Sequence, residues 1–220
     1  MVAITREQIV EGILKGTAKA NARYEKWSNG WWVTDSGVEG LMVASIAEAL
    51  HRRQEAHESV LMEMSMANVA EWSKAMPRRG RRPATFKDGN RVDLVLLNGF
   101  DQPICVIEVK RRWVQKPGLK DLDRVYDLVR RLSHWDNGSL QRGFLAMMIA
   151  KSARGKKTAE DRIAEEKTKI ETMVRSHFEN RETTGLRFFS GRSARMAHRF
   201  QEGYGDWATA GFCIEVYASR

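Results

Sequence analysis

The stretch VDLVLLNGFDQPICVIEVK, residues 92–110, decides the fold that this sequence predicts. It contains two apolar runs, VDLVLLN (92–98) and ICVIEVK (104–110), separated by GFDQP. Runs of this length that are rich in Val, Ile and Leu are typical of buried strands, and Asn98-Gly99 supplies turn chemistry between them. We therefore predict a β-hairpin near the middle of the chain.

Helical and strand patterns alternate on both sides of this hairpin. Helices are predicted over 5–26, about 38–54, 119–132 and 159–178, with a short helical turn in 68–76. Strands are predicted over 143–150, 186–190 and 211–218, and 58–66 is either a strand or a continuation of the second helix. This order predicts an α/β fold with a central mixed β-sheet flanked by helices.

The length and charge of the chain indicate its organisation and its class of partner. At 220 residues it fits one domain with an added arm, which we place as an N-terminal helical arm over 1–37 and a domain over 38–220. It carries 37 Lys and Arg against 28 Asp and Glu, a formal net charge of +9. A basic domain favours a polyanionic partner, most commonly nucleic acid, although excess arginine on a solvated surface is the alternative.

Several classes of protein are disfavoured by the same sequence. It contains no apolar run near the roughly 18 residues that a transmembrane helix needs, and its first residues turn polar too early for a secretory signal peptide. Cys105 and Cys213 lie inside apolar runs, which indicates buried strand residues and neither a disulfide framework nor a zinc site. We therefore expect a cytoplasmic protein without a membrane partner.

Three polar side chains interrupt the two hairpin strands. Asp93 begins the first strand, and Glu108 and Lys110 end the second. Residues two apart on a strand share one face, so Glu108 and Lys110 point the same way and Val109 points into the core. If the strands pair antiparallel along their length, Asp93 comes opposite Glu108, and two carboxylates there make an oxygen site suited to Mg²⁺. The alternative is a salt-bridge ladder at a sheet edge.

The pattern VD (92–93) followed by IEVK (107–110), a helix and another strand resembles the PD-(D/E)XK nuclease superfamily. The resemblance covers roughly residues 38–150, which we take as the core of the domain, and Val92 stands where the superfamily motif has proline. It implies a restriction-endonuclease-like fold, in which a four-stranded mixed sheet is flanked by helices. It also implies Mg²⁺-dependent cleavage of phosphodiester bonds, mostly in DNA.

This resemblance implies roles for the residues that match the motif. Asp93 and Glu108, with the Val109 carbonyl, would hold Mg²⁺, and we expect Mn²⁺ to substitute. Lys110 would position the attacking water and offset charge on the phosphate. Paired cuts on two strands usually need two active sites, which favours a homodimer.

Many superfamily members also carry a glutamate on the helix before the sheet. The two candidates are separated by helical geometry: Glu39 falls roughly 50° from the centre of the apolar face and Glu48 roughly 130° away. We therefore expect Glu39 to point toward the sheet, where it would bind a second metal, and Glu48 to point toward solvent. Glu63 in the first strand is a third candidate, and a favourable charge at the helix N-terminus is the alternative role of Glu39.

Basic residues cluster in three segments next to these strands. They can contact phosphates and so position a nucleic acid over the metal, while a solvated charge run is the alternative. The residues are Arg78, Arg79, Arg81 and Arg82 before the Asp93 strand, Arg111 and Arg112 after Lys110, and Lys151, Arg154, Lys156 and Lys157 after the next strand.

The sequence therefore predicts a Mg²⁺-dependent endonuclease that acts on DNA. A catalytically inactive nucleic-acid-binding module on the same fold is the first alternative, and a partner-binding protein with little affinity for DNA is the second. The choices between DNA and RNA, and between duplex, junction and single strand, stay open at this point.

Overall fold

The structure is a computed structural model that describes residues 4–53, 58–75, 89–134, 137–181, 184–192, 194–195 and 206–218. Its strands are β1 (Ser59–Ser65), β2 (Arg91–Leu97), β3 (Pro103–Arg112), β4 (Arg142–Ser152), β5 (Thr184–Ser190), β6 (Ala194–Arg195) and β7 (Trp207–Ala218). Its helices are α1 (Arg6–Trp27), α2 (Val33–Ser36), α3 (Glu39–His51), α4 (Met66–Trp72), α5 (Gln115–Leu132) and α6 (Ala159–Phe178).

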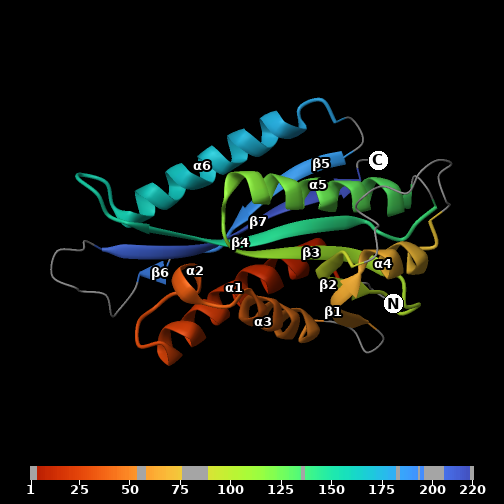
Figure 1. Ribbon diagram of the computed structural model, residues 1–220, viewed down its shortest axis with the longest axis horizontal. Helices are drawn as coiled ribbons and strands as arrows, with labels where there is room; N and C mark the ends of the chain where they lie inside the picture. The colour runs from red at the N-terminus through yellow and green to blue at the C-terminus, as the bar shows by residue number, and fades with distance from the viewer. Residues whose placement is uncertain are drawn as a thin grey trace.

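Within these residues the strands form one mixed sheet of seven strands. Their order is β1-β2-β3-β4-β7-β5, with β6 also paired to β7. β3 and β4 run parallel, and the other paired strands run antiparallel. Figure 1 shows α5 and α6 on one face of the sheet and α1, α2 and α3 on the other. The predicted α/β fold with a mixed sheet flanked by helices is confirmed.

The central strands are buried on both faces, which explains their continuous apolar runs. In β3, Val106 packs in the cluster that contains α5 and α6, whereas Ile107 and Val109 pack in the cluster that contains α1 and α3. The predicted hairpin is β2 and β3, in register at Leu94 and Ile107. Val109 thus points into the core, as the two-residue period predicts.

α1 packs closely on α3 beneath the sheet. Its N-terminus has a capping box between Thr5 and Gln8. Gly16 permits the close approach, because a Cβ there would lie 2.5 Å from the Ile46 Cα. α1 therefore contributes to the core between α3 and the sheet. The division of the chain into an arm and a domain at residue 37 stays a prediction.

Some element boundaries differ from the prediction. α5 begins at Gln115, four residues early, because Pro117 lies in the first helical turn, where its missing N–H needs no partner. β7 begins at Trp207 and pairs with β4 as far as Ser152, so these two strands form a longer ribbon than expected. Residues 76–88, which hold the four arginines before β2, lie outside the described residues.

Both cysteines are buried in strands, Cys105 in β3 and Cys213 in β7, and both are free thiols. The prediction that they are core residues is confirmed. Among the described helices, none combines the length and the apolar character needed to cross a membrane.

Candidate active site

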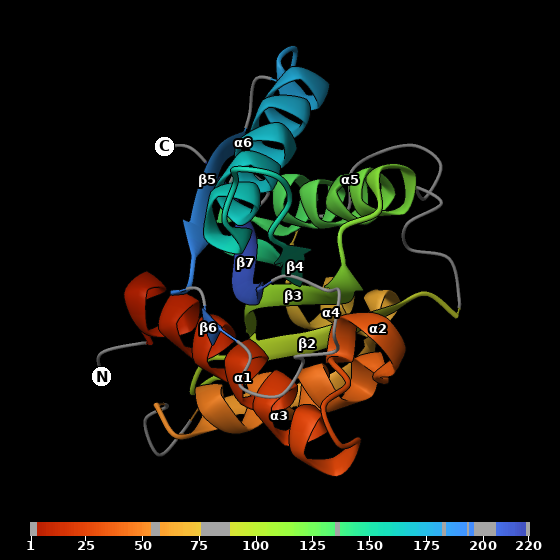
Figure 2. The ribbon, with the colours of Figure 1, turned by 90° about the vertical axis from the view of Figure 1, so that its left-hand side faces the viewer.

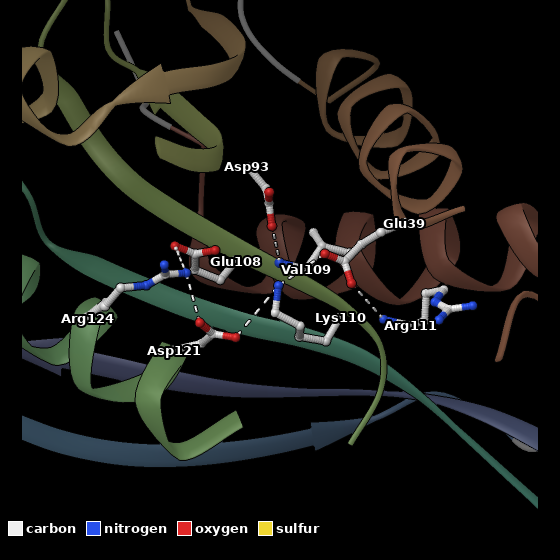
Figure 3. Close-up of polar contacts among 8 residues, drawn as sticks. All are labelled: Glu39, Asp93, Glu108, Val109, Lys110, Arg111, Asp121 and Arg124. Atoms are coloured by element: carbon white, nitrogen blue, oxygen red, sulfur yellow. Dashed lines mark hydrogen bonds and ion pairs between the residues drawn. The ribbon is translucent and has the colours of Figure 1, made fainter. Parts of the chain in front are cut away.

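The β2–β3 hairpin opens at the start of β2. The antiparallel pairing of β2 with β3 ends at Leu94 and Ile107. If the pairing continued by one residue, Asp93 would lie opposite Glu108. Instead, the Val109 backbone N–H donates a hydrogen bond of 2.6 Å to Asp93 Oδ2. The carboxylate thus takes the place that a carbonyl of the neighbouring strand would fill, and Asp93 and Glu108 lie near one another at the opening (Figure 3).

Glu108 and Lys110 both reach side chains of α5. Arg124 Nη2 lies 3.0 Å from Glu108 Oε1 and 2.8 Å from Asp121 Oδ1. The other Asp121 oxygen lies 3.6 Å from Lys110 Nζ. The shared face that the two-residue spacing predicts is therefore confirmed, and α5 forms its opposite wall.

Glu39 approaches the same group from α3, as its first residue. Lys110 Nζ donates a hydrogen bond of 3.0 Å to Glu39 Oε1, and the Arg111 backbone N–H donates one of 3.2 Å to Glu39 Oε2. The Arg111 guanidinium turns away and donates to the Gly37 carbonyl at 3.0 Å. Glu39 therefore points toward the sheet, as its place on the helix face predicts.

The two other acids considered from the sequence behave differently. Glu48 does not simply face solvent, because it forms ion pairs with Lys19 and Arg23 of α1. The helical wheel did not include the packing of α1 against this side of α3. Glu63 is exposed and has a φ of 55°, and its charge is one of the influences that raise the pKa of Asp93.

Burial raises the pKa of both hairpin carboxyls. The pKa of Asp93 is raised although the hydrogen bond from Val109 and the charge of Lys110 both act to lower it. Burial raises the pKa of Glu108 to about 8, and the charge of Arg124 opposes this rise. The pair therefore resists full ionisation unless further positive charge comes close.

Lys110 has the opposite balance. Burial disfavours its ammonium form, but the hydrogen bond to Glu39 and the charge of Asp121 outweigh burial and raise the pKa of Lys110 above its usual value. The amine therefore stays protonated at neutral pH and acts as a cation and hydrogen-bond donor.

Asp93, Glu108 and the Val109 carbonyl are oxygen donors, which suit a hard divalent cation. Among the described residues, no group of three or more His, Cys, Asp or Glu side chains is arranged to enclose a metal ion. Lys110 and Arg124 form ion pairs with these acids. However, Glu108 Oε1 is buried and makes no hydrogen bond, even with Arg124 3.0 Å away. This poorly satisfied oxygen fits a site that accepts a further cation.

The predicted phosphate-binding residues divide into three groups. Arg111 and Arg112 follow the site on β3, and Arg112 is exposed. Lys151 forms an ion pair of 2.8 Å with Glu166, and Lys157 pairs with Glu165. The exposed cations Arg154 and Lys156 lie in the same segment. Arg78, Arg79, Arg81 and Arg82 lie outside the described residues.

Asp121 and Arg124 are site residues that the sequence reasoning missed. They lie in the sequence DLDR (121–124), and Asp121 is 6% exposed. One signal was present, because Asp121 falls on the same helical stripe as Val125, among the buried positions of α5. A carboxylate on such a stripe requires a partner.

A cavity of about 530 Å³ lies away from this site. Its lining residues belong to β1, α4, β2 and the β2–β3 turn, and they are Ser59, Leu61, Glu71, Trp72, Lys74, Leu97, Phe100 and Asp101. None of the polar residues described above lines this cavity. The candidate active site is therefore defined by its side-chain contacts at the hairpin opening.

Comparison of the chain with protein-family models, with curated proteins and with solved structures found no match. The features that bear on its class are therefore those of the site. They are a cluster of four acids, of which Glu108 and Asp121 are buried, one amine held between Glu39 and Asp121, and an opened pair of strands at the same point.

Proposed function

We propose that this protein is a Mg²⁺-dependent endonuclease that hydrolyses phosphodiester bonds in DNA. One observation carries the proposal: in the cluster of Figure 3 the acids outnumber the basic side chains that pair with them, since the Arg111 guanidinium bonds the Gly37 carbonyl instead. Its carboxylates are Glu39, Asp93, Glu108 and Asp121, and its basic side chains are Lys110 and Arg124. Four negative and two positive groups leave a charge of −2 when all are ionised, which favours the binding of a divalent cation.

The sheet supports a restriction-endonuclease-like core of the PD-(D/E)XK superfamily. β1, β2 and β3 are joined antiparallel, and β3 then pairs parallel with β4 through the crossover helix α5. This is a four-stranded mixed unit with the Asp93 and Glu108 strands at its centre. The net charge of +9 and the exposed Arg112, Arg154 and Lys156 favour a polyanionic substrate.

In this proposal Asp93, Glu108 and the Val109 carbonyl hold the divalent cation, and Glu39 holds a second one directly or through water. A bound cation supplies Lewis-acid polarisation of the phosphate and a lower pKa for its bound water. Arg124 orients Glu108 through their ion pair, and Asp121 steadies both Arg124 and Lys110.

Lys110 acts in this proposal as a fixed ammonium group. Held between Glu39 and Asp121, it donates hydrogen bonds to a phosphate oxygen and to the attacking water. Its raised pKa makes it a poor proton acceptor, so its role is to orient the water and stabilise the charge that develops on the phosphate. Hydrolysis joins the water oxygen to phosphorus and breaks one ester P–O bond, and a proton from the water, carried by solvent, ends on the sugar oxygen that leaves.

A cleavage assay tests the proposal. Plasmid, linear, junction and single-stranded DNA are incubated with Mg²⁺, Mn²⁺ or EDTA, and we expect cleavage with either metal and none with EDTA. Asp93→Ala and Lys110→Ala should each lower the rate by at least about a hundredfold, since each removes a preorganised charge. Lys120→Ala, which removes an exposed amine from α5, is the matched control and should cleave normally.

Full cleavage by folded Asp93→Ala and Lys110→Ala proteins would contradict this assignment. The alternative, an inactive nucleic-acid-binding module, predicts salt-dependent DNA binding with no cleavage and no heat of Mg²⁺ binding in calorimetry. Circular dichroism of each variant shows whether a lost activity reflects lost folding.

A further inference from the structure

The strands β4 and β7 continue past the candidate active site as a projecting ribbon. β3 pairs with β4 only as far as Met148, whereas β4 and β7 stay paired for four further residues of β4, to Ser152. Lys110 lies opposite Met147 in this register, so the ribbon extends from the end of the sheet that carries the site. Figure 1 shows it reaching beyond the end of β3, and Figure 2, which faces this end, shows β7 between α6 and α1. We call residues 149–157 and their β7 partners the ribbon.

A tight basic turn closes the ribbon at its tip. The Arg154 backbone N–H donates a hydrogen bond of 3.0 Å to the Lys157 carbonyl, and the Lys157 N–H returns one of 3.2 Å to the Arg154 carbonyl. Gly155, with a φ of 61°, supplies the left-handed conformation that such a turn favours. Arg154 and Lys156 are exposed, and within the part of the chain that the structure describes neither forms an ion pair. The tip therefore presents two cations to solvent.

The neighbouring charges of the ribbon are engaged with α6. Lys157 pairs with Glu165, and Lys151 pairs with Glu166 at 2.8 Å. Asp161 accepts hydrogen bonds in the capping box at the start of α6, so its carboxylate is also engaged. The unpaired positive charge of the ribbon is therefore concentrated at its tip.

Contacts from three other elements hold the ribbon in place. The Arg162 guanidinium of α6 donates a hydrogen bond to the Ser152 carbonyl. The ring of Trp207, at the start of β7, lies 5.1 Å from the ring of Trp32, which precedes α2. β6 pairs with the same stretch of β7. The tip is therefore held at a set distance from the site.

This distance matches the spacing of phosphates in a duplex. Strand residues rise about 3.3 Å each, so Arg154 lies roughly 20 Å along β4 from Met147, the residue opposite Lys110. Successive phosphates of one strand of B-DNA are about 3.4 Å apart along the helix axis, so roughly 20 Å corresponds to about six base pairs. A single strand is flexible and keeps no fixed spacing between its phosphates. The rigid ribbon therefore favours a duplex as its partner.

We propose that the ribbon tip binds the phosphate backbone of duplex DNA about six base pairs from the phosphate that lies at Lys110. This inference rests on the proposed endonuclease function and specifies its substrate as a duplex. Arg154 and Lys156 contact phosphates of that backbone, so they position the duplex over the site without reading its sequence.

Binding measured without metal tests the inference separately from cleavage. Fluorescence anisotropy in EDTA, over a series of salt concentrations, compares a labelled duplex of about two helical turns with an oligothymidylate of equal length. The double variant Arg154→Gln/Lys156→Gln should bind the duplex at least about tenfold more weakly at about 0.1 M salt. Its salt slope should fall by about 2, one for each lost phosphate contact. The loss on the oligothymidylate should be smaller.

The matched control is the double variant Lys120→Gln/Lys169→Gln. It removes the same charge from exposed positions on α5 and α6, away from the ribbon. Its duplex affinity and its salt slope should stay close to those of the wild type.

A crosslink measures the spacing between the tip and the site. Both native cysteines are buried, so a photoreactive group attaches selectively to the thiol of Lys156→Cys. On a duplex whose cut position in Mg²⁺ has been mapped, we expect the crosslink about six base pairs from the cut.

Each outcome has a defined meaning. An Arg154→Gln/Lys156→Gln protein that binds the duplex as the control variant does, or that loses equally on duplex and single strand, would overturn the inference. Crosslinks spread evenly along the duplex would overturn it too. Thermal melting confirms that the variants are folded. Failure of the proposed function is a different result, namely a wild-type protein that cleaves no DNA in Mg²⁺, and the binding measurements in EDTA then still decide the role of the ribbon.

Discussion

Two buried glutamates lie on opposite faces of the sheet, and their surroundings differ. Glu215 in β7 is fully buried on the α1 face, with Arg142 and Arg187 each 3.5 Å from its carboxylate. Glu108 in β3 is 2% exposed on the α5 face, and it shares its single arginine, Arg124, with Asp121. Glu215 thus pairs with two arginines, whereas Glu108 pairs with one arginine that also pairs with Asp121.

This difference shows that burial by itself does not mark a functional acid. Burial raises the pKa of both glutamates. At Glu215 the arginines oppose that rise, and the local charge is positive. At Glu108 the charge of Arg124 also opposes the rise in pKa, but the nearby charges of Asp93 and Asp121 add to it. We interpret Glu215 as part of a structural ion cluster and Glu108 as part of a site that lacks one partner.

The largest effect expected from this comparison is at the structural cluster. Arg142→Ala leaves Glu215 buried with one arginine, and we expect the free energy of unfolding to fall by about 3 kcal/mol. We expect the same loss with and without Mg²⁺, because Glu215 already has two arginines 3.5 Å away, although its Oε1, like that of Glu108, makes no hydrogen bond. Urea denaturation measures it, and adding Glu215→Gln to Arg142→Ala should recover part of the loss. Recovery by Mg²⁺ instead would contradict the distinction between the two glutamates.

The second prediction concerns pH at the candidate site. Between the ordinary carboxyl pKa and about 8, folded protein keeps a proton on Glu108 that the unfolded chain has released. Stability therefore falls as pH rises through this window. Glu108→Gln cannot ionise, so its stability relative to wild type should increase by on the order of 2 kcal/mol between about pH 5 and about pH 9 in EDTA.

Urea denaturation over this pH range measures the difference between the two proteins. Glu215→Gln is the comparison variant, and its advantage over wild type should grow less, because Arg142 and Arg187 favour the ionised carboxylate. A flat difference between wild type and Glu108→Gln would show that Glu108 is already fully paired.

Local periodicity was enough to predict the parts of the site that belong to single elements. The two-residue period of a strand placed Glu108 and Lys110 on one face and Val109 in the core. The helical period of α3 directed Glu39 toward the sheet, where it meets Lys110. These predictions required no knowledge of how the elements pack.

The remaining contacts depend on how elements pack, which one sequence does not specify. Asp121 and Arg124 are site residues only because α5 packs over β3 with the helix face that carries them turned toward Glu108 and Lys110. Glu48 was expected to face solvent, and it pairs with α1 because α1 and α3 lie side by side. The predicted helix began at Leu119, whereas α5 begins at Gln115 because the first helical turn accepts Pro117.

The smallest expected effect is the stabilisation of the protein by Mg²⁺, which should depend on the candidate active site and not on the Glu215 cluster. If the candidate active site binds Mg²⁺, the ion at about ten times its dissociation constant should raise the free energy of unfolding by about 1.4 kcal/mol. For a chain of this length that corresponds to a rise of roughly 4 °C in the melting temperature. Asp93→Asn should lose this rise because it removes one oxygen charge at the hairpin opening, whereas Glu215→Gln should keep it. An equal rise in wild type and Asp93→Asn would place the bound Mg²⁺ elsewhere on the protein, and the charge deficit at Glu108 would then need another explanation.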